Sequence, residues 1–148
     1  MISLEDYINE NAIRHYVDGI IIFEDKVLIL RRANYMRKFK SLWGFVGGSI
    51  DKKDKDSKEA IIREIKEETQ IELTPNEKNN MKLLETVKHD DDSTTEYWLV
   101  TLESNPEIKI SKEHSKYEWI DNDSLSKKTY KFIPGILEII KKCLSYSK

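Results

Sequence analysis

The chain has 148 residues, 39% of them hydrophobic and 35% charged, which suffices for one domain, residues 1–148, with its own core. Its 25 basic and 27 acidic residues give a formal net charge of −2. This near balance argues against a surface dominated by phosphate-backbone contacts, so nucleic acid is not the expected partner.

The sequence also bears on the compartment in which the protein works. It has no apolar run of roughly 18 residues, and its first segment lacks the basic-then-apolar order of a secretion signal. The only cysteine, Cys143, lies in the apolar run IPGILEIIKKCL, so we expect a packed thiol and no intrachain disulfide. We therefore expect a cytoplasmic protein with no membrane partner.

Two β-rich segments open the predicted fold, HYVDGIIIF at residues 15–23 and KVLILRR at residues 26–32. The dipeptide Glu24-Asp25 between them is typical of a hairpin turn. Both segments are therefore predicted to be neighbouring strands of a central sheet.

A strand-like segment, LWGFV, then runs into the dipeptide Gly47-Gly48. Because glycine has no Cβ, the backbone here is free to approach a phosphate closely or to direct a carbonyl at a bound ion. Asp56 and Ser57 follow, and their side-chain oxygens can cap the first free N–H groups of a helix. The sequence predicts a helix that begins near residue 56.

This predicted helix carries an acidic stripe about 120° away from an apolar one. Like charges at such spacing repel by about a few tenths of a kcal/mol per pair, so a bound cation would make the stripe favourable. Oxygen ligands suit Mg²⁺ or Mn²⁺. Alone, EIKEE is more typical of a solvated helix face, but beside the Gly-Gly turn and the cap it favours a metal site. The acidic stripe consists of Glu64, Glu67 and Glu68, and the apolar one of Ile61, Ile62, Ile65 and Thr69.

The remainder of the chain supplies more strands and a closing helix. MKLLETVKH and TTEYWLVTL alternate in polarity and flank DDDS, a predicted hairpin tip. KYEWI is a further short strand, and the aliphatic spacing after Pro134 predicts a C-terminal helix. Strands between helices predict an α/β sandwich with a mixed sheet.

The segment from Gly47 to Ile71 resembles the box of the Nudix hydrolase family, which reads G, five residues, E, seven residues, then R-E-U-x-E-E-x-G-U, where U is bulky and aliphatic. Gly47 and Gly48 match its opening glycines. The matching positions of its second half are Arg63, Glu64, Ile65, Glu67, Glu68 and Ile71.

Three departures from the pattern affect the loop and the helix end. The loop is one residue longer, and Lys55 stands at the family's first glutamate, so we expect Asp54 to substitute for it. Gln70 replaces the late glycine, which adopts a left-handed conformation more easily, so we expect the helix to end differently here.

The resemblance implies a Nudix-type α/β/α sandwich with a mixed sheet between helices. It further implies a hydrolase dependent on Mg²⁺, or on Mn²⁺, that cleaves a diphosphate linkage in a nucleotide derivative. The catalytic residues implied are Arg63, Glu64, Glu67 and Glu68, with Arg63 orienting a glutamate through a salt bridge. The implied metal ligands are Glu64, Glu67, Glu68 and the carbonyl of Gly47.

The residue that would take a proton from the attacking water is left open by the sequence. Such a base needs hydrogen-bond reach and a pKa near the working pH. The histidines show no metal spacing, and none is assigned to catalysis. The candidate bases are Glu67 and Glu68 and, more weakly, Glu96, Glu113 and Glu118, and the histidines are His15, His89 and His114.

The favoured substrate is a nucleoside triphosphate or a sugar nucleotide, with coenzyme A and ADP-ribose as alternatives. Arg32 and Arg37, in the basic run RRANYMRKFK, are candidates for binding the anionic substrate, although a solvated loop explains this run equally well. Four aromatic residues are candidates for stacking on a base: Trp43, Phe45, Tyr97 and Trp98. Because neighbouring strand residues point to opposite faces, about half of these four should instead lie in the core.

Two expectations concern partners and the rival function. The altered first half of the box motivates the alternative of a catalytically weak, Nudix-like module that binds a nucleotide and regulates a partner. The resemblance also carries the expectation of a homodimer, because family members often dimerise.

Overall fold

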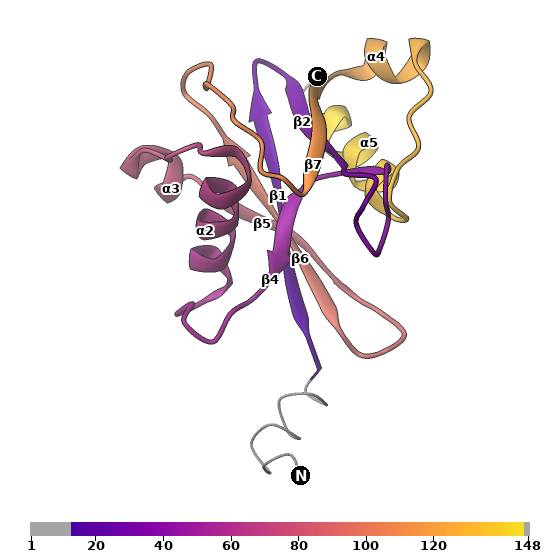
Figure 1. Cartoon of the computed structure of the whole chain (residues 1–148). Coiled ribbons are helices and arrows are strands. Elements are labelled where there is room, and N and C mark those ends of the chain that lie inside the picture. The colour runs from indigo at the N-terminus through magenta and orange to yellow at the C-terminus, as the bar shows by residue number, and fades with distance from the viewer. Residues whose placement is uncertain (1–12, 147–148) are drawn as a thin grey trace.

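The computed structural model describes residues 13–146 as a mixed β-sheet between two helical layers. Figure 1 shows α2 and α3 on one face of the sheet and α5 on the other. This confirms the predicted α/β/α sandwich. The strands are β1 His15–Phe23, β2 Lys26–Arg32, β3 Trp43–Gly44, β4 Val46–Ser49, β5 Lys82–Lys88, β6 Thr94–Thr101 and β7 His114–Ile120. The helices are α2 Ser57–Thr69, α3 Pro75–Asn79, α4 Asn122–Lys127 and α5 Ile136–Tyr146.

The sheet has the order β3-β2-β1-β6-β5, with β7 paired to β2 and β4 paired to β1. Strand β1 runs parallel to β6 along one edge. Its other edge is shared, because β4 pairs with residues 16–19 and β2 pairs only with residues 22 and 23. The far edge of β4 is therefore free of a strand neighbour within the described residues, and it faces the helix that follows it.

Both predicted hairpins are confirmed. Glu24 and Asp25 both have positive φ, 49° and 64°, as a tight two-residue turn between antiparallel strands requires. Strands β5 and β6 are antiparallel, and the tip between them is closed by a hydrogen bond from the His89 N–H to the Ser93 carbonyl.

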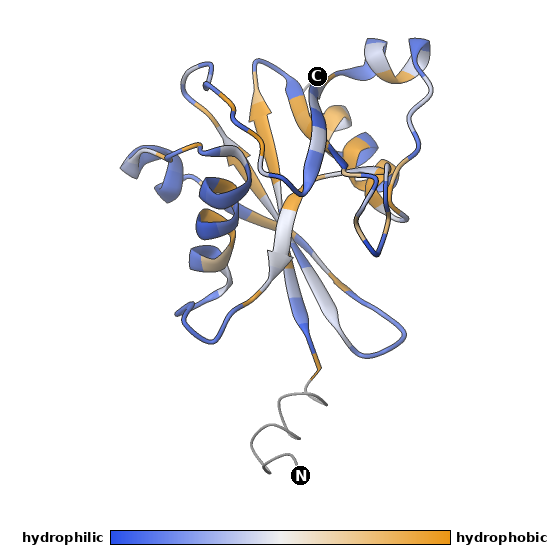
Figure 2. Cartoon of the chain, viewed as in Figure 1, coloured by the Kyte–Doolittle hydropathy of each residue, from blue (hydrophilic) through white to orange (hydrophobic). Residues whose placement is uncertain are grey.

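Two hydrophobic cores fill the spaces on either side of the sheet. Side chains alternate along β1, so that Val17 and Ile21 pack toward α2 while Ile20 packs toward α5. Figure 2 shows apolar residues concentrated in the sheet and in α5, whereas much of the outer surface of α2 is hydrophilic. Cys143 is buried in the α5-side core, as predicted.

The two ends of α2 decide one prediction each. At its start, the Asp56 side chain accepts a hydrogen bond from the Glu59 N–H at 2.8 Å, so the predicted cap is confirmed. At its end, Gln70 adopts the left-handed conformation itself, with φ 62° and ψ 17°, and donates its N–H to the Lys66 carbonyl. The expectation that the helix would end differently without glycine is wrong. Gln70 adopts the left-handed conformation that glycine usually provides, although this conformation is less favourable for a residue with a Cβ.

The C-terminal helix is confirmed but begins at Ile136, after Gly135 with φ 90°, rather than directly at Pro134. The short helices α3 and α4 were not expected from the sequence. Within residues 13–146, no helix is both long and apolar enough to cross a membrane.

Candidate functional site

The three glutamates of the acidic stripe differ in burial. Glu68 is only 4% exposed, and its Oε2 accepts a hydrogen bond from the Gly47 N–H at 3.1 Å. Glu64 is half-buried against Gly48. The Glu67 side chain is 57% exposed and lies 3.2 Å from Arg63. The site therefore forms where the inner face of α2 meets β4.

The glycines of the turn are required by their neighbours. A Cβ added to Gly48 would lie 2.5 Å from a carboxylate oxygen of Glu64, and a Cβ added to Gly47 would overlap the Asp18 side chain. Carboxylates thus occupy the space on both faces of β4 that side chains would fill, and only glycine permits this approach.

Gly47 also presents a carbonyl to the site. Its Cα pairs with that of Asp18 across β1 and β4, yet its N–H is donated to Glu68 instead of to β1. The N–H and C=O of an extended residue point to the same edge of a strand, so the carbonyl lies on the outer edge of β4, on the side of Glu68.

Arg63 connects the loop to the helix. Its Nε and Nη2 donate to Asp54 Oδ1 and Oδ2 at 3.0 and 2.9 Å, and Nη1 donates to Glu64 at 3.0 Å. Nη2 also reaches the carbonyl of Ser49 at 3.3 Å. These hydrogen bonds lower the pKa of Asp54 and raise that of Arg63. Asp54 therefore makes, despite the longer loop, a contact that ties this loop to the helix.

Glu64 and Glu68 form a close carboxylate pair. The pKa of Glu68 is raised well above its usual range by burial, by the charge of Glu64 and by a hydrogen bond to Glu64. Burial also raises the pKa of Glu64. Two buried carboxylates this close favour either a shared proton or a cation between them.

A divalent cation fits this donor set. Carboxylate and carbonyl oxygens are the ligands that Mg²⁺ and Mn²⁺ prefer. Within residues 13–146, however, no three acidic, histidine or cysteine side chains already converge as a complete metal site. The carboxylate that stands apart is Glu67, because it is turned toward Arg63.

The remaining base candidates lie in three different places. Glu113, exposed just before β7, is close enough to Glu68 for its charge to raise the Glu68 pKa. Glu96 accepts a hydrogen bond from the Ser57 hydroxyl at 2.9 Å. Glu118 accepts one from the Tyr130 hydroxyl at 2.6 Å. Glu113 thus lies near Glu68, whereas Glu96 lines a cavity together with Glu64.

Sequence reasoning missed His114, which the fold brings to this pair. Its imidazole is buried, and Nε2 lies 3.6 Å from Glu68 Oε1. Burial, and secondarily the charge of Arg32, lowers the pKa of His114 to about 4. No local signal marks this contact, because it depends on the pairing of β7 with β2, where His114 lies opposite Arg32.

Asp18 was also missed, although a signal existed. It lies half-buried on β1 on the opposite face of the sheet, against Gly47. Burial, together with the charge of Glu64, raises its pKa to about 7. An acidic residue within the apolar run HYVDGIIIF is unusual for a central strand and could have identified it.

The aromatic residues expected to stack on a base are largely core. Trp43 and Phe45 are only 8% and 7% exposed, and they pack edge-to-face against Tyr130 and Tyr97. The burial of Trp43 and Phe45 argues against their stacking on a base, because their rings fill the space under α5. Trp98 is partly buried against the other core.

The two arginines proposed for substrate binding have different settings. Arg32 is half-buried, donates from Nε to the Lys38 carbonyl at 2.9 Å, and lies near His114. Arg37 is exposed in the segment 33–42. Arg32 thus lies at the edge of the site, whereas nothing in the structure fixes Arg37 there.

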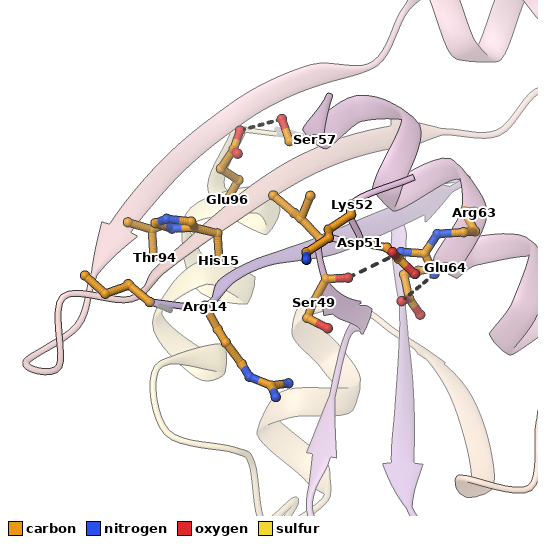
Figure 3. Close-up of a pocket in the computed structure, with 12 residues that line it drawn as sticks. Arg14, His15, Ser49, Asp51, Lys52, Ser57, Arg63, Glu64, Thr94 and Glu96 are labelled. Atoms are coloured by element: carbon orange, nitrogen blue, oxygen red, sulfur yellow. Dashed lines mark hydrogen bonds and ion pairs between the residues drawn. The ribbon is translucent and has the colours of Figure 1, made fainter. Parts of the chain in front are cut away.

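A cavity of about 880 Å³ adjoins the carboxylates. Figure 3 shows Arg63 and Glu64 at one end of it and His15 and Thr94 at the other, with Glu96 between them held by Ser57. The lining is mainly polar and charged, so the cavity suits an ionic, hydrogen-bonding molecule.

Comparisons with known proteins agree with this geometry. The family model described as NUDIX domain matches residues 13–143. One similar solved structure is the bifunctional NMN adenylyltransferase/ADP ribose pyrophosphatase from Francisella tularensis, complexed with AMP and Mn ion. The alignment covers 97% of this chain and 47% of that protein, with 22% sequence identity and a TM-score of 0.77. Another is the NUDIX domain of Shewanella oneidensis NrtR, complexed with ADP ribose. The alignment covers 99% of this chain and 100% of that domain, with 21% sequence identity and a TM-score of 0.71.

Two further comparisons define the extent of the likeness. MutT from Aliivibrio salmonicida and Vibrio cholerae matches 91% of this chain and 99% of its own, at 20% identity and TM-score 0.73. The chain spans about half the length of the first structures that it matches, 51% for the Enterococcus faecalis MutT/nudix family protein and 47% for the Francisella enzyme. No curated protein sequence matches.

Proposed function

Because this chain belongs to the Nudix hydrolase family, whose domain model matches residues 13–143, we propose that it hydrolyses a diphosphate linkage in a nucleotide derivative with the help of Mg²⁺ or Mn²⁺. The observation that carries this proposal is the close pair of the half-buried Glu64 and the buried Glu68 beside the outward-facing backbone of Gly47. This arrangement concentrates oxygen donors where a cation and a phosphate can meet.

The protein's own residues would act mainly by holding charge in place. A bound divalent ion neutralises phosphate oxygens and lowers the pKa of a coordinated water. Glu64, Glu68 and the Gly47 carbonyl would hold the ion, with Glu67 available after release from Arg63. Arg63 keeps Glu64 oriented and is itself anchored by Asp54.

The proposed reaction consumes one water molecule per anhydride bond. A carboxylate takes a proton from the water, whose oxygen bonds to one phosphorus as the P–O bond of the bridging oxygen breaks. The other phosphate leaves with the bridging oxygen. We propose Glu113 as the base in preference to Glu96 or Glu118, because it directly precedes His114, whose ring lies 3.6 Å from Glu68, and because its carboxylate is exposed.

The proposed substrate is a nucleoside triphosphate or sugar nucleotide, with coenzyme A and ADP-ribose as alternatives. The polar cavity beside Glu64 supports a ligand rich in phosphate and hydroxyl groups. The ligands AMP and ADP ribose, named for two structurally similar proteins, support a nucleotide. We further propose a homodimer, which size-exclusion chromatography with light scattering would test, and a cytoplasmic location, with which the buried Cys143 is consistent.

The test is hydrolysis of a substrate panel in Mg²⁺ or EDTA, with released phosphate measured with and without added phosphatase. The panel contains nucleoside triphosphates, sugar nucleotides, ADP-ribose, dinucleotides and coenzyme A. Metal-dependent turnover should fall by at least about 100-fold in Glu68→Gln. The control is Glu72→Gln, because the Glu72 side chain is 75% exposed and pairs with Lys66 on the surface. Undiminished turnover in Glu68→Gln would contradict the assignment.

A second candidate function is a nucleotide-binding regulatory module with weak or no catalysis. The observation that favours it is Glu67, which pairs with Arg63 instead of joining the other two carboxylates. Calorimetry separates the two functions: nucleotide binding in Mg²⁺ without product formation would support the module, and turnover would exclude it.

A further inference from the structure

We propose that His114 is a positioning residue that donates a hydrogen bond from Nε2 to Glu68 and so fixes the direction of the Glu68 carboxylate. This inference rests on the proposed function, in which Glu68 binds the metal. His114 comes from β7, which pairs with β2, whereas β4 pairs with β1, and no motif of the sequence includes it.

The two oxygens of Glu68 face different donors. Oε2 accepts the N–H of Gly47 at 3.1 Å, and Oε1 lies 3.6 Å from Nε2 of His114. A separation of 3.6 Å is slightly longer than a hydrogen bond, and a small movement of either side chain would bring Nε2 and Oε1 within hydrogen-bond distance. Donors on both oxygens would prevent the carboxylate from rotating away from the site.

Burial at this contact is nearly complete. The side chains of His114 and Glu68 are only 3% and 6% exposed. Little room is left for water to replace the imidazole as a donor to Oε1, and a buried carboxylate oxygen without a donor is costly.

The other ring nitrogen indicates which tautomer is present. Nδ1 of His114 is buried and has no hydrogen-bond partner among the described residues. A proton on Nδ1 would leave a buried donor unsatisfied, whereas a proton on Nε2 leaves only a lone pair there. The burial thus favours the tautomer whose N–H faces Glu68.

The backbone around His114 holds the ring in this place. The Ser111 N–H donates to the carbonyl of Glu68 at 3.0 Å, and the His114 N–H donates to the carbonyl of Ser111 at 3.1 Å. The Lys109 N–H donates to the carbonyl of Thr69 at 3.0 Å. The segment 109–114 is therefore attached to the last turn of α2 through the backbone carbonyls of Glu68 and Thr69, which keeps the backbone of His114 close to the Glu68 side chain.

The experiment measures Mn²⁺ affinity by calorimetry in the full chain, for wild type, His114→Phe and His114→Gln. Phenylalanine fills the ring's space without a donor, while glutamine restores an N–H near Nε2. We expect His114→Phe to weaken Mn²⁺ binding about tenfold or more and His114→Gln to recover most of that loss. The matched control is His89→Phe, since His89 bonds Thr95 at the far end of the β5–β6 hairpin.

A second readout needs no metal. Nitrogen-15 NMR of the imidazoles should show His114 with its proton on Nε2 and its signals shifting when Glu68 is changed to glutamine. Equal Mn²⁺ affinity of folded His114→Phe and wild type, or a proton on Nδ1, would overturn the inference. Absence of saturable Mn²⁺ binding by the wild type would instead overturn the proposed function, and the inference with it.

Discussion

Arg63 donates two parallel hydrogen bonds, of 3.0 and 2.9 Å, to the carboxylate of Asp54, whose side chain is only 3% exposed. The box pattern has a glutamate in this part of the loop, and the chain has Lys55 there after a one-residue insertion. Asp54, which is one position earlier and one methylene shorter than the family's glutamate, thus makes an ion pair with Arg63. The loop therefore stays attached to α2 despite the inserted residue.

Replacing Asp54 tests this relationship. Asp54→Asn keeps the volume but leaves the Arg63 guanidinium without its carboxylate, so the free energy of unfolding should fall by about 1–3 kcal/mol. Urea unfolding in EDTA measures it. The control is Glu72→Gln, whose ion pair with Lys66 is exposed at both ends and should change stability by less than about 0.5 kcal/mol. Equal losses in the two variants would contradict a structural role for Asp54.

The same pair predicts a pH dependence. The hydrogen bonds from Arg63 lower the pKa of Asp54 in the folded protein, whereas the unfolded chain has a value near about 3.9. The stabilisation is therefore complete above the unfolded value and is lost as the pH falls through the folded one. The difference in stability between wild type and Asp54→Asn should accordingly shrink below about pH 4, and a constant difference there would refute this account.

The features predictable from the sequence are local ones. The start of α2 follows from the capping oxygen of Asp56, and the hairpin at Glu24 from turn chemistry over two residues. The face of α2 that carries Glu64 and Glu68 follows from helical spacing alone. Each of these depends on residues within about one turn of each other, which is the range over which a sequence pattern is informative.

The features that could not be predicted depend on long-range pairing. His114 reaches Glu68 only because β7 pairs with β2, and Asp18 reaches Gly47 only because β4 pairs with β1. Phe45 is apolar and lies just before β4, but which face of the sheet its ring occupies depends on where α5 packs. A one-residue change of strand register would reverse that face.

Gln70 predicts a stabilising substitution. Its φ of 62° lies in the left-handed region, which costs about 1 kcal/mol for a residue with a Cβ. Gln70→Gly should therefore raise the free energy of unfolding by about 0.5–1 kcal/mol, because the relief exceeds the added entropy of the unfolded chain. The control is Gly135→Ala, which should lower the free energy of unfolding, because Gly135 has a φ of 90° that alanine adopts only with strain. Among the described residues, no atom beyond its chain neighbours lies within 4 Å of an added Cβ there, so the backbone conformation alone would cause the loss. Destabilisation by Gln70→Gly would show that its side chain makes a needed contact.

Asp18 predicts that the metal-free protein loses stability as the pH rises. Its pKa is raised to about 7 by burial and by the charge of Glu64, above the unfolded value near about 4. Between these values the folded state binds more protons than the unfolded state, so the free energy of unfolding falls as the pH increases. Asp18→Asn should be more stable than wild type by at least about 1 kcal/mol at pH 8 and similar to it at pH 4. Thermal unfolding in EDTA measures both, and parallel pH profiles would reject the assignment.

The position of Glu113 predicts the identity of the base. Because its exposed carboxylate directly precedes His114, whose ring lies 3.6 Å from Glu68, Glu113→Gln should lower kcat by about 100-fold or more while leaving the fold intact. Glu96→Gln should have a smaller effect, since Glu96 is held by Ser57 at the start of α2. Steady-state kinetics on the substrate found in the panel, with circular dichroism as the folding control, compare the two. If Glu96→Gln lowers kcat more than Glu113→Gln does, then Glu96, which lines the cavity, and not Glu113 is the base.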